Sequence, residues 1–179
     1  MNPDSKIDLI SMIQQFAAVD SVGVSAMRNQ GPGVLKAVQR YLGHLRLDDI
    51  PVKSEKEFGV WLAERTEGLL RAMPLNTRPW GTARKALSLF LRGCLYNHYL
   101  RRRYRLQRIE HWLEIPLDRV TASALKREAG RGKLPRWPGL KHLRKQTSDK
   151  FQAYAQVYSE SVDLPARIFV DNYLWLKNR

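Results

Sequence analysis

The chain turns into a helix at the stretch Arg78-Pro79-Trp80-Gly81-Thr82-Ala83-Arg84-Lys85-Ala86-Leu87. Pro79 fixes its backbone φ angle and Gly81 tolerates a positive one, so the backbone can turn sharply here. From Thr82 onward apolar residues recur at intervals of three and four and form one helical stripe: Ala83, Ala86, Leu87, Phe90 and Leu91. A turn that delivers a helix N-terminus leaves backbone N–H groups pointing outward. It therefore predicts an anion-binding site.

The net charge indicates which anion to expect. The 179 residues include 31 Lys and Arg against 17 Asp and Glu, which gives a net charge of +14. Such an excess predicts an anionic partner, and nucleic-acid phosphate is the anion that suits a helix N-terminus. The alternative interpretation is a basic protein whose charge serves only its solubility.

A second turn follows at Ile115-Pro116-Leu117-Asp118-Arg119-Val120. Aspartate is a favoured residue at the start of a helix, so Asp118 is expected to cap one that carries Val120, Ala124 and Leu125. By itself, such a residue indicates only a cap. Likewise, Lys85 alone indicates a first-turn lysine on an exposed face.

Together the two segments resemble the helix-hairpin-helix DNA glycosylase superfamily, which includes endonuclease III and the 8-oxoguanine glycosylases. Members carry a hairpin similar to Gly81-Thr82-Ala83-Arg84-Lys85-Ala86, followed by a proline, an apolar residue and an aspartate that opens a helix. The resemblance places Lys85 where bifunctional members keep a nucleophilic lysine. It places Asp118 where they keep an essential aspartate.

The resemblance implies an enzyme that excises a damaged base from double-stranded DNA, with possible lyase activity. Lys85 would attack the sugar as a neutral amine, and Asp118 would assist it. If Lys85 pointed elsewhere, Asp118 could activate water instead. An oxidised purine is the expected base, because archaeal 8-oxoguanine glycosylases share the long spacing between lysine and aspartate. The enzyme is expected to act as a monomer.

Several residues are expected to contact DNA beside this pair. Arg101, Arg102, Arg103 and Arg105 form the densest positive run, and no acidic run lies near them in the sequence. Arg136 belongs to a basic loop over residues 130–139. The expected DNA-binding residues are Trp80, Gly81, Thr82, Ala83, Arg84, Arg101, Arg102, Arg103, Arg105 and Arg136. Trp137 and Trp175 are candidates to stack on a flipped base, although tryptophans at such positions commonly belong to the core.

No metal or other cofactor is expected. The chain has one cysteine, Cys94, which excludes an internal disulfide and a cysteine-ligated iron–sulfur cluster. His98, His111 and His142 lack the spacing of metal ligands. The implied branch of the superfamily is therefore the one without a cluster.

Helical periodicity dominates the chain, and no strand-like alternation is present. The prediction is an all-α, two-lobed helical domain with a helix-hairpin-helix motif and a central cleft. Residues 1–179 would form one domain, in which 54–130 make the hairpin-containing lobe and 1–53 plus 131–179 the second lobe. The N-terminus has no signal-peptide pattern and no stretch is long enough to span a membrane, so a cytoplasmic, nucleoid-associated protein is expected.

Two other classes of function remain open on sequence grounds. One is a catalytically silent nucleic-acid-binding module that uses the hairpin only for phosphate contacts. The other is a helical adaptor for an acidic protein partner. A steep loss of duplex affinity with added salt would favour nucleic acid, and release of a damaged base would separate an enzyme from a module.

Overall fold

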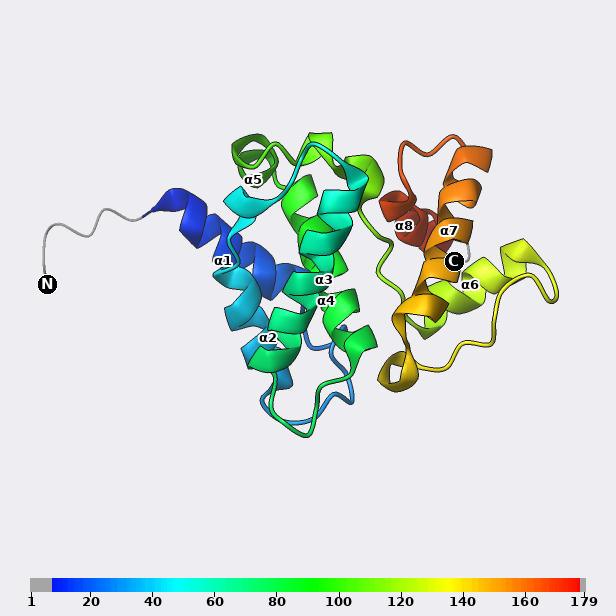
Figure 1. Cartoon of the computed structure of the whole chain (residues 1–179), viewed down its shortest axis with the longest axis horizontal. Coiled ribbons are helices and arrows are strands. Elements are labelled where there is room, and N and C mark those ends of the chain that lie inside the picture. Colours follow the sequence, from blue (N-terminus) through cyan, green and yellow to red (C-terminus); the bar gives the residue numbers. More distant parts are fainter. Residues whose placement is uncertain (1–7, 178–179) are drawn as a thin grey trace, which may run out of the picture.

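The all-α prediction is confirmed. The computed structural model describes residues 8–177, so the ends of the expected domain, 1–7 and 178–179, lie outside the described residues. Within that range the chain forms eight α-helices and no strand (Figure 1). They are α1 (Leu9–Ser21), α2 (Val34–Gly43), α3 (Glu55–Ala72), α4 (Trp80–Tyr96), α5 (His98–Arg103), α6 (Arg119–Ala129), α7 (Lys145–Ser161) and α8 (Val170–Lys177). None of these helices has both the length and the apolar character that crossing a membrane requires.

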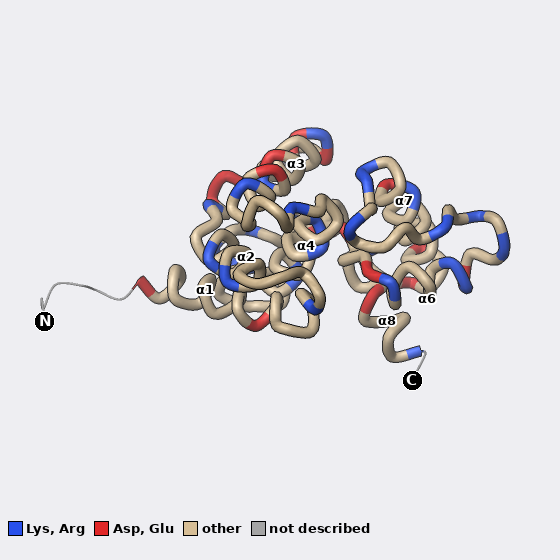
Figure 2. The backbone as a smooth tube through the Cα atoms, turned by 90° about the horizontal axis from the view of Figure 1, so that it is seen from below, with Lys and Arg blue, Asp and Glu red and all other residues tan. Residues whose placement is uncertain are grey.

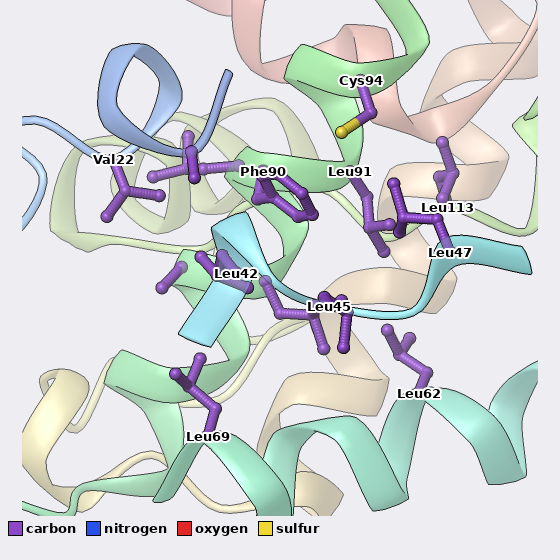
Figure 3. Close-up of a cluster of buried hydrophobic side chains, with 14 of the residues drawn as sticks. Val22, Leu42, Leu45, Leu47, Leu62, Leu69, Phe90, Leu91, Cys94 and Leu113 are labelled. Atoms are coloured by element: carbon purple, nitrogen blue, oxygen red, sulfur yellow. The ribbon is translucent and has the colours of Figure 1, made fainter. Parts of the chain in front are cut away.

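The first hydrophobic cluster lies around α4. Helices α1, α2 and α3 pack on it, and the buried residues run from Ala17 to Leu113 along the chain, with Ala166 and Ile168 added from the segment before α8. In Figure 3, Leu42 of α2 lies between Phe90 of α4 and Leu69 of α3. Helix α4 is buried on almost every side over its first three turns, so it is the element on which the others are assembled.

A second, smaller cluster is formed by α6, α7 and α8. Its buried residues begin at Ile115 and include Phe151 of α7 and Leu174 of α8. The two clusters divide at Glu114, and the segment before α8 returns to the first cluster through Ile168. In Figure 1 the two groups of helices lie side by side along the long axis.

This division differs from the expected lobes 54–130 and 1–53 plus 131–179. Helices α1 and α2 share a core with α3 and α4, whereas α6 leaves that core and packs on α7 and α8. A buried glutamine explains part of the difference. The Gln14 amide of α1 donates to the carbonyls of Leu42, Gly43 and Leu45, at 3.3, 3.3 and 2.7 Å, which ties α1 to the end of α2.

The helical stripe that begins at Thr82 belongs to α4, which is followed at once by a second helix, α5. Helix α4 ends at Tyr96, and the side chain of Asn97 then accepts hydrogen bonds from the backbone N–H groups of Tyr99 and Leu100, which makes it the cap of α5. Asparagine is a favoured residue at the N-cap because its short side chain reaches the free N–H groups in the first turn of a helix. Between α5 and α6 the chain forms the 3-10 turns η2 (Leu106–Arg108) and η3 (Glu110–Trp112).

Candidate functional site

Lys85 and Asp118 meet where the two hydrophobic clusters adjoin. Lys85 lies in the second turn of α4, and Asp118 caps α6. The lysine Nζ is 3.0 Å from Oδ2 of Asp118, and it also donates a longer hydrogen bond, 3.4 Å, to the carbonyl of Ala26. The Lys85 side chain is 9% exposed and that of Asp118 is 32% exposed, so solvent reaches the pair from the aspartate side.

The local chain path explains why the Asp118 carboxylate is free to pair. Its Oδ1 accepts hydrogen bonds from the N–H groups of Val120 and Thr121, at 2.9 and 3.0 Å, which confirms the predicted cap. The other oxygen, Oδ2, faces Lys85. The preceding segment is held by the Gln152 amide, which donates to the carbonyl of Ile115 and accepts from its N–H group.

The surroundings keep this carboxyl group ionised. Burial alone would raise the pKa of Asp118, but the ammonium of Lys85 and the N–H groups of Thr121 and Val120 together lower that pKa below its ordinary value of 3.8. Asp118 is therefore a carboxylate at neutral pH. A buried cation and a carboxylate at hydrogen-bond distance are a pair between which a proton can be transferred.

The residue before the lysine has a structural role. Arg84 is 6% exposed, and its guanidinium makes a bidentate contact with Glu114, with both nitrogen–oxygen distances 2.8 Å. It also donates to Oγ1 of Thr66 and lies over the ring of Trp80, 5.5 Å from the ring centroid. Arg84 and Trp80, both predicted to contact DNA, are thus engaged with one another and with the protein interior.

A pocket of about 540 Å³ adjoins Asp118. Helices α4, α6 and α8 line it, and its polar groups form a short chain. Arg92 donates to Asp171, at 2.6 Å, and to Asn172, at 2.9 Å, while Thr121 donates to the other Asp171 oxygen at 2.6 Å. Trp175, 51% exposed, belongs to the same lining. The structure therefore brings the predicted Trp175 and Asp118 to one pocket.

The N-terminus of α4 does not present the expected outward-facing anion site. Gly81 is buried beneath the 3-10 turn η4 (Leu140–His142), and a Cβ atom at Gly81 would lie 2.5 Å from the Leu140 carbonyl and 2.7 Å from Cβ of Leu143. The N–H groups of Thr82 and Ala83 donate to the carbonyl of Pro79. The expectation fails because a segment far along the chain covers this helix end.

Thr82 and Ala83 are likewise buried. Both have 0% exposure, and the Thr82 hydroxyl donates to the Gln30 side chain at 2.6 Å. In this arrangement Gly81, Thr82, Ala83 and Arg84 serve packing and offer no surface to DNA. A DNA contact by these residues would require η4 to move.

We expect Gly81→Ala to lower the free energy of unfolding by about 1–3 kcal/mol, because the added methyl overpacks a site closed by backbone. Gly59→Ala in α3 is the matched control. A Cβ there meets nothing within 4 Å, and alanine is about 1 kcal/mol better than glycine inside a helix. Denaturant unfolding of both variants measures the difference. A Gly81→Ala protein as stable as Gly59→Ala would contradict the closed site.

The arginine run after α4 is partly neutralised. Arg101 pairs with Glu110 at 3.3 Å and Arg103 with Asp48 at 2.8 Å, whereas Arg102 and Arg105 are exposed. Two of the four arginines therefore have carboxylate partners, although no acidic run lies near them in the sequence. Asp48 comes from the segment after α2, which the linear sequence does not place nearby. DNA contact by this run stays a prediction.

The remaining candidates divide between core and surface. Trp137 meets Phe151 edge-on, with 5.8 Å between ring centroids, and packs against the second cluster. Its neighbour Arg136 is exposed. Trp137 is thus a partly buried residue at the edge of the second cluster, while Arg136 is available for contact. Among residues 8–177 no group of three or more His, Cys, Asp or Glu side chains could hold a metal ion.

Sequence reasoning missed the partners that hold the site. Glu114 stands between the buried residues Leu113 and Ile115 and pairs with Arg84, which its position in the sequence does not indicate. Arg92 and Asp171 carry no signal of their pairing either, because they lie on helices whose packing the sequence does not reveal.

Comparisons of the chain with models of known families, with curated proteins and with solved structures found no match.

Proposed function

We propose that this protein is a base-excision DNA glycosylase and AP lyase that acts on a damaged base, an oxidised purine, in double-stranded DNA. The observation that carries the proposal is the 3.0 Å contact between Lys85 and Asp118. The hairpin resemblance implies a catalytic role for the same two residues. They come from different helices and from segments that belong to different hydrophobic clusters.

The geometry suits nucleophilic displacement at C1′ of the damaged nucleotide. The Lys85 ammonium must first lose one proton, which the Asp118 carboxylate at 3.0 Å can accept and pass to the departing base. The amine lone pair then forms the bond to C1′ while the electrons of the glycosidic bond leave with the base. A second proton moves from the nitrogen to the ring oxygen as the sugar opens, which leaves a Schiff base. Subsequent β-elimination cleaves the strand.

The pocket beside Asp118 supports the same function. A base must leave the duplex before its glycosidic bond is accessible, and the flipped base then needs an enclosing site. A volume of about 540 Å³ falls within the range usual for small-molecule sites. Trp175 contributes an aromatic ring to the lining, and the Arg92–Asp171–Asn172 group contributes hydrogen-bonding side chains. The proposed enzyme acts as a cytoplasmic, nucleoid-associated monomer without a cofactor.

Borohydride trapping on a panel of lesion duplexes tests the proposal, because borohydride reduces a lysine Schiff base to a stable covalent complex. The native protein is expected to be trapped on at least one lesion, most strongly on an oxidised purine. Lys85→Gln, which keeps a polar side chain of similar length, is expected to abolish trapping.

Lys150→Gln is the matched control, since Lys150 is exposed on α7 and no ion pair of it is found within residues 8–177. It should be trapped like the native protein. Trapping that persists in Lys85→Gln would assign the nucleophile elsewhere. Duplex binding with no base release from any lesion would leave the silent binding module as the better account.

A further inference from the structure

Half of the net positive charge lies in one short segment. Residues 126–145, which we call the basic strap, run from the last turn of α6 through the following loop and η4 to the first residue of α7. The strap holds eight cationic side chains and one carboxylate, a net +7 out of +14. The cations are Lys126, Arg127, Arg131, Lys133, Arg136, Lys141, Arg144 and Lys145. Figure 2 shows the blue segments gathered along the loop beyond α6.

Almost none of this charge is neutralised within the protein. The strap's one carboxylate, Glu128, is bound by Lys177 of α8 at 2.9 and 3.0 Å, and Lys145 pairs with Asp149 at 2.7 Å. No other strap cation has an ion-pair partner among residues 8–177. The arginine run at α5 differs, since two of its four members are paired. Unpaired like charges repel one another, and a bound polyanion would relieve that repulsion.

Apolar anchors hold the strap backbone in place. Leu134 and Leu143 are 8% and 3% exposed in the second cluster, and Trp137 packs on Phe151. The cationic side chains between these anchors are exposed. Alternation of buried anchors with exposed cations preorganises the surface, so less conformational entropy is lost when a ligand binds.

The strap also occupies the place where hairpin amides were expected to hold a phosphate. Its Leu140 carbonyl and Leu143 side chain close over Gly81. At the same end of α4, Lys141 of the strap and Arg78 of the hairpin turn line one pocket of about 440 Å³. The strap therefore carries its cations from the outer end of α6 to the end of α4 that holds Lys85.

From these observations we infer that the basic strap, in place of the hairpin amides, binds the phosphate backbone of duplex DNA. The choice of duplex DNA as partner rests on the proposed function, whereas the location of the contact rests on the strap's own charge, exposure and anchoring. Contacts of this kind fix the position of the protein on the duplex without reading its sequence.

The test measures affinity for an undamaged duplex as a function of salt concentration. The strap variant changes Arg131, Lys133, Arg136 and Lys141 to glutamine. Each lost phosphate contact lowers the slope of log affinity against log salt by about 0.9, so a fall of about 2–4 is expected, with at least ~10-fold weaker binding near 0.1 M salt. The control variant removes the same charge elsewhere by changing Lys36, Lys53, Lys56 and Arg71 to glutamine, all of which are exposed.

A slope that falls in the strap variant and stays near the native value in the control supports the strap as the phosphate surface. If the salt slope is the same in both variants, or if the strap variant keeps the native slope, the strap is not the phosphate-binding surface. Thermal unfolding confirms that both variants are folded. Because the duplex carries no lesion, failure of the trapping experiment would leave this result standing. Conversely, an unchanged salt slope in the strap variant would not contradict borohydride trapping through Lys85.

Discussion

Replacing Glu114 with alanine is expected to lower the free energy of unfolding by about 3–5 kcal/mol, because it leaves the guanidinium of Arg84 buried without its counter-ion. The two side chains are 12% and 7% exposed and share two contacts of 2.8 Å. The remaining acceptors of Arg84, Oγ1 of Thr66 and the carbonyl of Leu62, carry no charge. Urea denaturation measures the change.

Two comparisons decide whether the cost comes from the unpaired charge. Asp149→Ala breaks an exposed pair with Lys145, in which the side chains are 49% and 62% exposed, and should cost less than about 1 kcal/mol. The double variant Arg84→Met with Glu114→Leu removes both charges and should recover much of the stability that Glu114→Ala loses. If the double variant is as unstable as Glu114→Ala, lost packing and not an unpaired charge is responsible.

The Arg84–Glu114 ion pair also helps to position the candidate site, because Glu114 lies four residues before Asp118. Glu114 is the residue at which the chain passes from the first cluster to the second. The guanidinium of Arg167 donates to the carbonyls of Trp112 and Leu113 on the preceding side, and Gln152 holds Ile115 on the following side. Residues 112–115 lead directly to Asp118. The hydrogen bonds that hold this segment therefore also hold the Asp118 carboxylate in position against Lys85.

The sequence could predict features that depend on near neighbours. The helices were recognisable from their apolar periodicity, and the cap at Asp118 from an aspartate after a proline and a leucine. The pairing of Lys85 with Asp118 was accessible only through the resemblance of two separated motifs, since neither residue alone carries enough information.

Features that depend on distant segments could not be predicted. Whether Gly81 faces solvent is decided by η4, whose 3-10 turn leaves no periodic signal in the sequence. Whether an arginine is free depends on carboxylates such as Asp48 that arrive from another part of the chain. For the same reason, the linear sequence identifies Arg101, Arg102, Arg103 and Arg105 as the densest positive run but does not show that two of them are paired.

Asp118→Asn is expected to slow release of the damaged base at least ~100-fold, the usual scale for a positioned acid–base group. Asparagine is as good a helix cap as aspartate, so its oxygen can keep the hydrogen bonds from Val120 and Thr121 while the charge beside Lys85 is lost. Undamaged-duplex affinity should therefore stay near the native value. Single-turnover assays with enzyme in excess isolate the chemical step from product release.

Glu128→Gln provides the matched control for this change. Glu128 lies on the same helix, α6, and pairs with a lysine, Lys177, at 2.9 Å, but it is not part of the pocket lining. Its removal should leave the single-turnover rate within about threefold of native, since a group outside the site makes no contact that changes in the transition state. A similarly small effect of Asp118→Asn on the single-turnover rate would mean that the Asp118 carboxylate has a structural role and no catalytic one. The Lys85–Asp118 contact would then be a structural ion pair, because an essential base that is replaced by an amide cannot accept the lysine proton.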